Sequence, residues 1–232
     1  MSARGRGGQG QPHAPRTSVQ SDLSADRSRA FALTPVSRET EARLDRFVAV
    51  LTTWQRRMNL IATSTEPVLW TRHIADSLQL LPLAPHARVW ADLGSGAGFP
   101  GLVIACALAE MSGSRVHLVE SNGKKAAFLR DAVHATAAPA VVHGMRAEDF
   151  VASPPEPIEI VTARALAPLT KLLAATYPLL KTGTRGLFPK GQDVAIELTE
   201  AAKYWKIQAS LAPSRTDPKA QIVLVQGLER KL

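Results

Sequence analysis

The sequence predicts an α/β fold: a mostly parallel seven-stranded sheet with an antiparallel edge strand and an N-terminal helical cap. From about residue 84 onward, short β-prone runs alternate with helical runs, which is the pattern of βαβ units. A glycine-rich stretch joins the first β-prone run to the helical run that follows it. Near the C-terminus, two β-prone runs are separated by too few residues for a crossover helix.

Seven runs are predicted as strands. They are the segments 88–93, 116–120, 140–143, 158–163, 185–189, 206–211 and 221–225. Helices are expected at 100–110, 124–137, 169–181 and 193–205. The last two strands should pair antiparallel, because segment 212–220 is short and contains Pro213 and Pro218.

The chain before the sheet is expected to form a tail and a helical cap. Residues 1–36 are rich in Gly, Arg, Ser, Pro and Gln, so we expect a disordered basic tail there. Over 39–59, apolar residues recur at three- and four-residue steps, which indicates an amphipathic helix with Ser37 as its N-cap. A second helix is expected over 66–81, with Pro82 closing it. The predicted parts are therefore the tail (1–36), the helical cap (37–83) and the domain that carries the glycine loop (84–232).

Composition narrows the class of protein. The chain has 232 residues, enough for one core plus an appendage, and its apolar content of 45% includes no unbroken run of about 18 residues. We therefore expect neither a membrane span nor a membrane partner. The single cysteine, Cys106, lies in an apolar stretch, which favours the cytoplasm over a secreted, disulfide-bonded protein. The formal net charge of +8 is consistent with a polyanionic partner.

Residues 92–101, Asp-Leu-Gly-Ser-Gly-Ala-Gly-Phe-Pro-Gly, are predicted to form a nucleotide-binding turn between a strand and a helix. Glycines there allow a sharp turn and let a ligand approach the main chain. The part from Gly96 to Gly101 satisfies the G-x-G-x-x-G dinucleotide pattern, and Glu120 ends the next strand where a ribose-binding acid belongs. By pattern alone, the loop fits both NAD and S-adenosylmethionine.

Two other functions are open at this point. Tyr177 and Lys181 have the Tyr-x-x-x-Lys spacing of NAD-dependent short-chain oxidoreductases, although Pro178 and Gly183 are unfavourable in the helix that this reading needs. A basic RNA-binding module without catalysis would share the charge and the helical cap, and the intact glycine loop argues against it. Asp92 favours S-adenosylmethionine, because dinucleotide folds usually carry an apolar residue directly before the first glycine.

Seven motifs resemble one family in their order along the chain. They are Trp54-x-x-x-Met58-Asn59-Leu60, Arg72-His73-Ile74-Ala75-Asp76-Ser77-Leu78, the loop at 92–101, Ser121-x-x-Lys124-Lys125-x-x-Phe128-Leu129, Arg146-Ala147-Glu148, Thr162-Ala163-Arg164-Ala165 and Lys190-Gly191. Together they resemble the small-subunit ribosomal RNA methyltransferase G family, also called GidB, over roughly residues 45 to 230. The resemblance implies a Rossmann-like class I methyltransferase fold with S-adenosyl-L-methionine as cofactor. It also implies methylation of guanine N7 at position 527, in the 530 loop of 16S rRNA, with the 30S subunit or its precursor as partner.

Guanine N7 has an in-plane lone pair, so its methylation needs no base to remove a proton before attack. No metal ion is expected. The resemblance implies cofactor contacts, and the residues expected to make them are Gly94, Phe99, Ala147, Glu148 and Arg164, with Asp92, Gly96 and Glu120 added from the loop and the second strand. Asp92 is expected to orient the methionine ammonium, directly or through water, and Glu120 is expected to accept hydrogen bonds from the ribose hydroxyls. Arg164 follows the fourth strand, at the carboxyl end of the sheet, and is expected to position substrate and cofactor as the catalytic residue.

Basic side chains around the same face are expected to bind RNA phosphates. They are Arg72, His73, Lys124, Lys125, Arg146 and Lys190. A structural role competes for His73, because Asp76 lies three residues further on and could hydrogen-bond to its ring.

Overall fold

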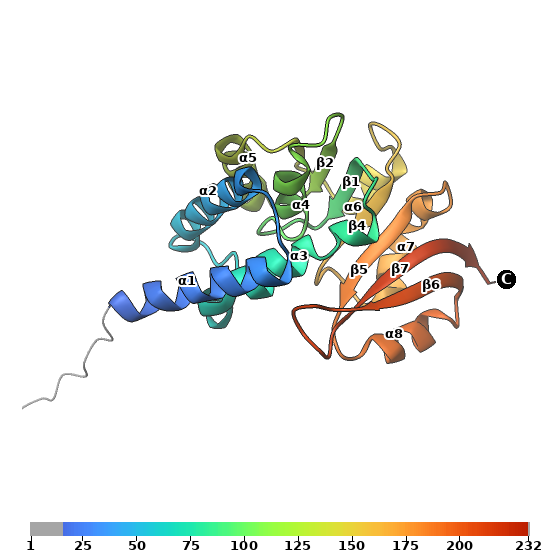
Figure 1. Ribbon diagram of the computed structural model, residues 1–232. Coiled ribbons are helices and arrows are strands. Elements are labelled where there is room, and N and C mark those ends of the chain that lie inside the picture. The colour runs from blue at the N-terminus through green and yellow to red at the C-terminus, as the bar shows by residue number, and fades with distance from the viewer. Residues whose placement is uncertain (1–15, 232) are drawn as a thin grey trace, which may run out of the picture.

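A computed structural model describes residues 16–231 and contains a seven-stranded sheet in the order β3-β2-β1-β4-β5-β7-β6 (Figure 1). The strands are β1 (Val89–Leu93), β2 (Arg115–Val119), β3 (Ala140–His143), β4 (Ile160–Thr162), β5 (Arg185–Lys190), β6 (Trp205–Pro213) and β7 (Gln221–Arg230). All seven coincide with predicted strands to within a few residues. The fold prediction is confirmed: only β7 runs against its neighbours, pairing antiparallel with β5 and with the edge strand β6.

The order of the strands fixes where a ligand can bind. β1 pairs in parallel with β2 on one side and with β4 on the other. The chain therefore leaves β1 toward β2 and β3, then crosses over to β4 and β5. Open α/β sheets bind ligands outside the carboxyl ends of the strands at such a reversal, which here lies between β1 and β4.

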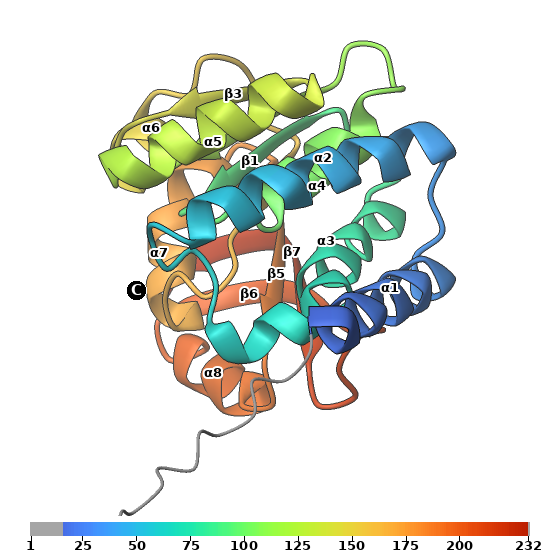
Figure 2. The same cartoon turned by 90° about the vertical axis from the view of Figure 1, so that its left-hand side faces the viewer.

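Helices cover both faces of the sheet (Figure 2). Three helices pack together on one face: α2 (Arg38–Gln55), α4 (Gly101–Leu108) and α5 (Gly123–Thr136). Three others are neighbours on the other face: α6 (Ala147–Ala152), α7 (Leu169–Leu180) and α8 (Val194–Ala201). Two buried clusters correspond to these layers, one around Phe47, Trp90 and Phe128 and the other around Phe150 and Phe188. α6 was not among the predicted helices, and the predicted helix 193–205 ends early because Trp205 starts β6.

The expected tail contains a helix, which corrects the prediction of disorder for much of residues 1–36. α1 spans Arg16–Leu33 and packs against the segment around Trp70, with the Phe31 and Trp70 rings 5.4 Å apart. Asp26 is buried and accepts hydrogen bonds from the Trp70 and Thr71 N–H groups at 2.8 and 3.1 Å. These contacts join residues that are 39 to 45 positions apart, so local composition gives no sign of them. Residues 1–15 of the predicted tail lie outside the described residues.

The helical cap forms as predicted over its first helix, α2, and differently over its second. The Ser37 hydroxyl oxygen accepts the Thr40 N–H at 3.1 Å, which confirms the predicted N-cap. The expected helix 66–81 is instead four short pieces: a 3-10 turn (η1, Thr63–Val68), a π-helix (η2, Trp70–Ala75), α3 (Asp76–Leu78) and a second 3-10 turn (η3, Leu81–Leu83). The Trp70 and Thr71 N–H groups donate to the Asp26 carboxylate, whereas in a regular helix they would donate to backbone carbonyls four residues earlier. The helical hydrogen-bond ladder is therefore interrupted at Trp70. Within residues 16–231, no helix is long and apolar enough to cross a membrane.

Candidate functional site

The glycine loop turns tightly between β1 and α4. Gly94, Gly96 and Gly98 have φ angles of 72°, 54° and 87°, in the left-handed region that residues with a Cβ rarely adopt. The Gly94 and Ser95 N–H groups donate to the Val119 carbonyl at 2.9 and 3.0 Å, which ties the loop to the end of β2. The backbone of the loop is thereby fixed at the carboxyl edge of the sheet.

Asp92 lies behind this loop and has no exposed surface. One carboxylate oxygen accepts the Gly101 N–H at 3.0 Å, and the other is buried without a hydrogen-bond partner. A Cβ on Gly101 would come within 2.6 Å of the Asp92 side chain, so glycine is needed there for the close approach. Burial raises the pKa of the Asp92 carboxyl to about 6. Asp92 is not among the residues that line the neighbouring cleft, and its hydrogen bond with Gly101 holds the start of α4. Its expected role toward the methionine ammonium, directly or through water, stays a prediction.

A cleft of about 350 Å³ opens at the carboxyl ends of β1, β2 and β4. It is lined by Gly94, Gly96, Val119, Glu120, Ser121, Lys125, Met145, Arg146, Ala147, Glu148, Arg164, Ala165 and Leu166. The structure thus brings together six of the eight expected cofactor residues, from four segments of the chain. Phe99 and Asp92 are the two that it places elsewhere. Phe99 is 4% exposed and packs beneath the His73 ring, with ring centroids 4.9 Å apart.

The lining of this cleft fits S-adenosylmethionine. Glu120 is almost buried, and its two oxygens accept the Gly96 and Asn122 N–H groups at 2.9 and 2.7 Å. A carboxylate has about four acceptor positions, so each oxygen keeps one for a ribose hydroxyl. Met145 and Leu166 are 39% and 43% exposed and supply apolar surface of the kind that a purine ring covers. Sequence reasoning missed both, because neither has a polar group to mark it.

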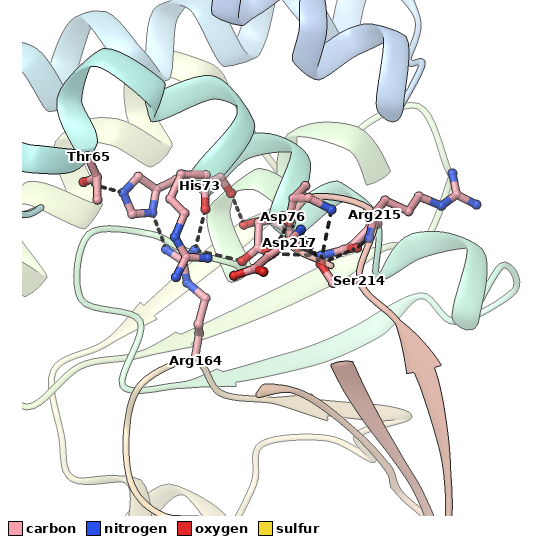
Figure 3. A network of polar contacts seen from close by, with 11 residues as sticks. Thr65, His73, Asp76, Arg164, Ser214, Arg215 and Asp217 are labelled. Carbon is pink, nitrogen blue, oxygen red and sulfur yellow. Dashed lines mark hydrogen bonds and ion pairs between the residues drawn. The ribbon is translucent and has the colours of Figure 1, made fainter. Parts of the chain in front are cut away.

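Arg164 stands at the centre of a polar network that joins the cap to the sheet (Figure 3). Its guanidinium donates to the Asp76 carboxylate at 3.1 Å, to the Arg72 carbonyl at 3.2 Å and to His73 Nδ1 at 2.9 Å. It also lies 5.1 Å from the centroid of the Phe99 ring. Burial lowers the pKa of Arg164, and Asp76 opposes that effect, so the side chain stays charged. Four groups therefore fix the orientation of this arginine.

His73 belongs to the interior of the network, which corrects its expected role in RNA binding. Arginine only donates hydrogen bonds, so His73 Nδ1 accepts one and Nε2 carries the hydrogen that it donates to Thr65 Oγ1 at 2.9 Å. Burial and the charges of Arg164 and Arg72 lower the pKa of His73 to about 3. The ring is neutral, and both nitrogens are occupied. Asp76, the partner expected for His73, instead pairs with Arg164, since the π-helix changes which side chains share a face.

A second cleft of about 200 Å³ lies on the other side of Arg164. It is lined by Arg72, Asp76, Arg164, Ala165, Pro189, Lys190, Gly191, Glu197, Asp217 and Ala220. Arg164 and Ala165 belong to both clefts and form the wall between them. Ala165 has a φ of 54°, a strained value for a residue with a Cβ, and such strain clusters at functional sites.

The remaining residues expected to bind RNA are distributed over the same face. Arg72, Lys124 and Arg146 are exposed, and Lys125 is partly exposed at the edge of the first cleft. Lys190 differs from expectation, because its side chain is only 11% exposed and its ammonium lies 2.7 Å from Glu197. Its ammonium also donates to the Ala167 carbonyl at 3.2 Å, so it supports the second cleft and is not free for a phosphate.

Two further features bear on function. A larger hollow of about 830 Å³ lies at the opposite, amino-terminal edge of the sheet, lined by segments 86–87, 154–159 and 179–185. It contains none of the expected site residues, and parallel sheets bind ligands at the other edge. Among residues 16–231, no three His, Cys, Asp or Glu side chains are arranged to hold a metal ion.

Comparison with known proteins decides the family. Residues 40–222 match the model of the family GidB, rRNA small subunit methyltransferase G. The ribosomal RNA small subunit methyltransferase G of Bradyrhizobium sp. strain BTAi1 is 58% identical over 208 residues, covering 90% of this chain and 94% of that protein. The protein of the same name from Nitrobacter hamburgensis is 59% identical, covering 92% and 82%. The chain belongs to the rRNA small subunit methyltransferase G family. This confirms the resemblance and overturns both alternatives, the oxidoreductase and the non-catalytic RNA-binding module. Tyr177 and Lys181, the pair on which the oxidoreductase alternative depended, line neither of the two clefts.

Solved structures share the fold of this family member. An O-methyltransferase from Bacillus cereus in complex with SAH has a TM-score of 0.56 at 14% identity, covering 90% of this chain and 99% of that one. The cofactor-bound protein Rv0187 from MTB has a TM-score of 0.56 at 14% identity, covering 94% and 99%. At such low identity the likeness concerns the fold alone, and it confirms the class I methyltransferase fold.

Proposed function

We propose that this protein transfers a methyl group from S-adenosyl-L-methionine to N7 of the guanine at position 527 of 16S rRNA. Membership of the rRNA small subunit methyltransferase G family is the observation that carries the proposal. Two adjacent clefts that share Arg164 support it, because methyl transfer needs a donor and an acceptor on either side of one reaction centre.

The chemistry suits a site without a general base. The cofactor supplies the methyl group of its sulfonium: the N7 lone pair forms the new N–C bond, the C–S bond breaks with its electron pair on sulfur, and no proton leaves. The protein therefore has to hold the base in line with the methyl group and exclude water. Arg164, fixed by Asp76, the Arg72 carbonyl and His73, is the rigid boundary at which donor and acceptor meet.

Each wall of the first cleft has a separate task. Glu120 holds the ribose through hydrogen bonds, and Met145 and Leu166 cover the adenine ring. Ala147 and Glu148, at the start of α6, border the same end of the cleft. Asp92 acts indirectly, by keeping Gly101 and the loop in place. Arg72, Lys125 and Arg146 line the two clefts, and Lys124 is exposed next to Lys125. These side chains contact RNA phosphates, which predicts binding that weakens steeply with salt.

The substrate is 16S rRNA within the 30S subunit or its precursor, and the protein acts in the cytoplasm, where ribosomes assemble. Incubation with S-adenosylmethionine labelled in its methyl group tests the proposal directly. We expect label in 7-methylguanosine from 16S rRNA of 30S subunits that lack the modification, identified after digestion by chromatography and mass spectrometry. Naked 16S rRNA and small-molecule acceptors are the comparisons. Label in another nucleoside, or in no RNA, would contradict the proposal.

A matched pair of variants tests the cofactor cleft. Glu120→Gln replaces one acceptor oxygen by a donor, so we expect the Kd for S-adenosylmethionine to rise roughly tenfold or more, since hydrogen bonds to charged groups contribute about 1.5–3 kcal/mol. Glu229→Gln makes the same change at an exposed residue of β7 and should leave the Kd unchanged. Calorimetric titration measures both. Equal affinities for the wild type and Glu120→Gln would remove Glu120 from the cleft's function.

A further inference from the structure

We propose that the second cleft is the pocket for the acceptor base and that Asp217 selects guanine by accepting hydrogen bonds from its N1–H and N2–H₂ groups. The inference rests on the proposed methylation of guanine N7 and goes beyond it, because it names the residue that chooses the base. The cleft suits a single base: its volume is about 200 Å³, and Arg164 and Ala165 separate it from the cofactor cleft.

Three acids line this cleft, and two of them are ion-paired within the cleft. Asp76 is bound to Arg164, and its other oxygen accepts the Thr216 hydroxyl at 2.8 Å. Glu197 is bound to Lys190 at 2.7 Å. Asp217 has no cation within 4.0 Å in the part of the chain that the structure describes, although it shares the cleft with Arg164. Among the described residues, the Asp217 carboxylate accepts one hydrogen bond, from the Lys219 N–H to one of its oxygens at 2.9 Å.

Asp217 is held in place by the turn that joins β6 to β7. Its N–H donates to the Ser214 hydroxyl at 3.3 Å, and its carbonyl accepts the Ala220 N–H at 3.0 Å. The neighbouring Thr216 hydroxyl reaches Asp76, which is itself fixed by Arg164. Figure 3 draws Asp217 together with Asp76 and Arg164, and all three line the second cleft. The carboxylate is therefore positioned on the same network that orients the arginine, and it stays available to a ligand.

The donor pattern of guanine matches a carboxylate on one edge. N1–H and N2–H₂ lie side by side on that edge, and the two oxygens of a carboxylate can accept both hydrogens. N7 lies on the opposite side of the purine, so a base read by Asp217 turns N7 toward Arg164 and the cofactor cleft. Adenine has an unprotonated N1 on the same edge and would face the carboxylate with a lone pair. Asp217 is partly exposed, and a base in the cleft would cover its carboxylate; left unpaired by adenine, the covered carboxylate gives discrimination.

The charge of Asp217 also suits the product. Because no proton leaves, the positive charge that begins on the sulfonium ends on the methylated base. A carboxylate that accepts from N1–H stabilises this cation more than it stabilises the neutral guanine. The effect grows along the reaction, which is the condition for an interaction to raise the rate and not only the affinity.

A base-analogue experiment on the whole enzyme tests the inference. 30S subunits are reconstituted on ligated 16S rRNA that carries either guanosine or inosine at the acceptor position. Inosine keeps N7, O6 and N1–H and lacks only the N2 amino group. For the wild type we expect single-turnover methyl transfer to be roughly 10- to 100-fold faster on guanosine, the range for one hydrogen bond to a charged group. For Asp217→Asn we expect this ratio to fall to about threefold or less, with a slower reaction on guanosine.

Controls separate the possible failures. Glu229→Gln, the same change at a β7 residue outside both clefts, should keep the wild-type ratio. The Kd for S-adenosylmethionine should stay unchanged in Asp217→Asn, because Asp217 does not line the first cleft. The inference is overturned if the ratio of the transfer rates on guanosine and inosine in Asp217→Asn equals that of the wild type. It is also overturned if the wild type methylates the two bases at the same rate, a result that does not depend on the stability of the variant. A wild type that transfers no methyl group to guanosine N7 refutes the proposed function instead.

Discussion

Replacing Arg164 by alanine should destabilise the protein as well as stop methyl transfer. The side chain is 17% exposed and donates to Asp76, to the Arg72 carbonyl and to His73. Its loss leaves the carboxylate of Asp76, which is 6% exposed, without its cation. Breaking a buried ion pair from one side costs about 3–5 kcal/mol. Thr216 and Gln79 still donate to the other oxygen of Asp76, so we expect the lower end, about 3 kcal/mol.

The assay combines unfolding with a second substitution. For a chain of this size, about 3 kcal/mol corresponds to a fall in Tm of roughly 6–12 °C, measured by circular dichroism, and to a matching shift in the urea midpoint. Asp76→Asn in the Arg164→Ala background removes the unpaired charge. The double variant should therefore recover part of the stability, by about 1–3 kcal/mol, without recovering methyl transfer to 30S subunits.

Two results would refute this reasoning. An Arg164→Ala protein with the Tm of the wild type would mean that the Asp76 carboxylate does not depend on the arginine. If the double variant loses as much unfolding free energy as Arg164→Ala and Asp76→Asn lose together, the two side chains are not coupled. Arg164→Lys is the conservative control: it keeps the charge but cannot donate to three acceptors in one plane, so it should be more stable than Arg164→Ala and still slow.

Three further predictions concern the loop and the network. Because the pKa of His73 is lowered to about 3, only the unfolded chain gains a proton there as the pH falls below 6.5. The free energy of unfolding of the wild type, relative to that of His73→Gln, should therefore fall by up to roughly 1.4 kcal/mol per pH unit toward pH 3. Urea titrations that give the same difference between the two proteins at every pH would contradict this. Asp92 has the opposite effect on the pH dependence, because its raised pKa of about 6 means that the folded chain holds a proton that the unfolded chain releases above pH 3.8. The free energy of unfolding should therefore decrease as the pH rises from 3.8 to 6, and urea titrations of Asp92→Asn should not show this decrease. Gly101→Ala should lower the free energy of unfolding by about 1–3 kcal/mol and weaken cofactor binding, because the new Cβ would meet Asp92 and Leu118. Gly123→Ala is the control, because the space around Gly123 is open and its stability should not change. Equal stabilities of the two variants in thermal unfolding would refute the packing argument.

The sheet and the loop could be predicted because their signals are local. Alternating β-prone and helical runs place all seven strands, and the glycines at 94, 96 and 98 occupy backbone conformations that favour glycine. Glu120, Ala147 and Glu148 line the cleft as expected because each follows a strand end, and parallel strands end at one edge. The pattern could not separate Asp92, which is buried behind the loop, from residues that face the cleft.

The cap could be predicted only in part, because its structure depends on contacts between distant residues. Asp26 and Trp70 are 44 positions apart, and their hydrogen bond both orders α1 and interrupts the helix that the 66–81 pattern indicates. Arg164 and Asp76 are 88 positions apart, and Thr216 and Asp76 are 140 apart. No motif spacing contains such pairs. His73 therefore had to be interpreted through Asp76, its neighbour in sequence, whereas its partners are Thr65 and Arg164.

These distant contacts explain why a class I methyltransferase sheet with an ordinary cofactor cleft carries a helical cap. The sheet alone supplies Glu120 and the glycine loop, but the groups that accept hydrogen bonds from Arg164 come from η2 and α3 of the cap. Asp76 then extends the same network to Thr216 in the turn between β6 and β7, beside Asp217. One chain of hydrogen bonds thus fixes the wall between the clefts and one side of the second cleft, the proposed acceptor pocket. Under the proposed base pocket, an RNA base would meet groups already held in place, so little free energy would be spent on ordering them during the reaction.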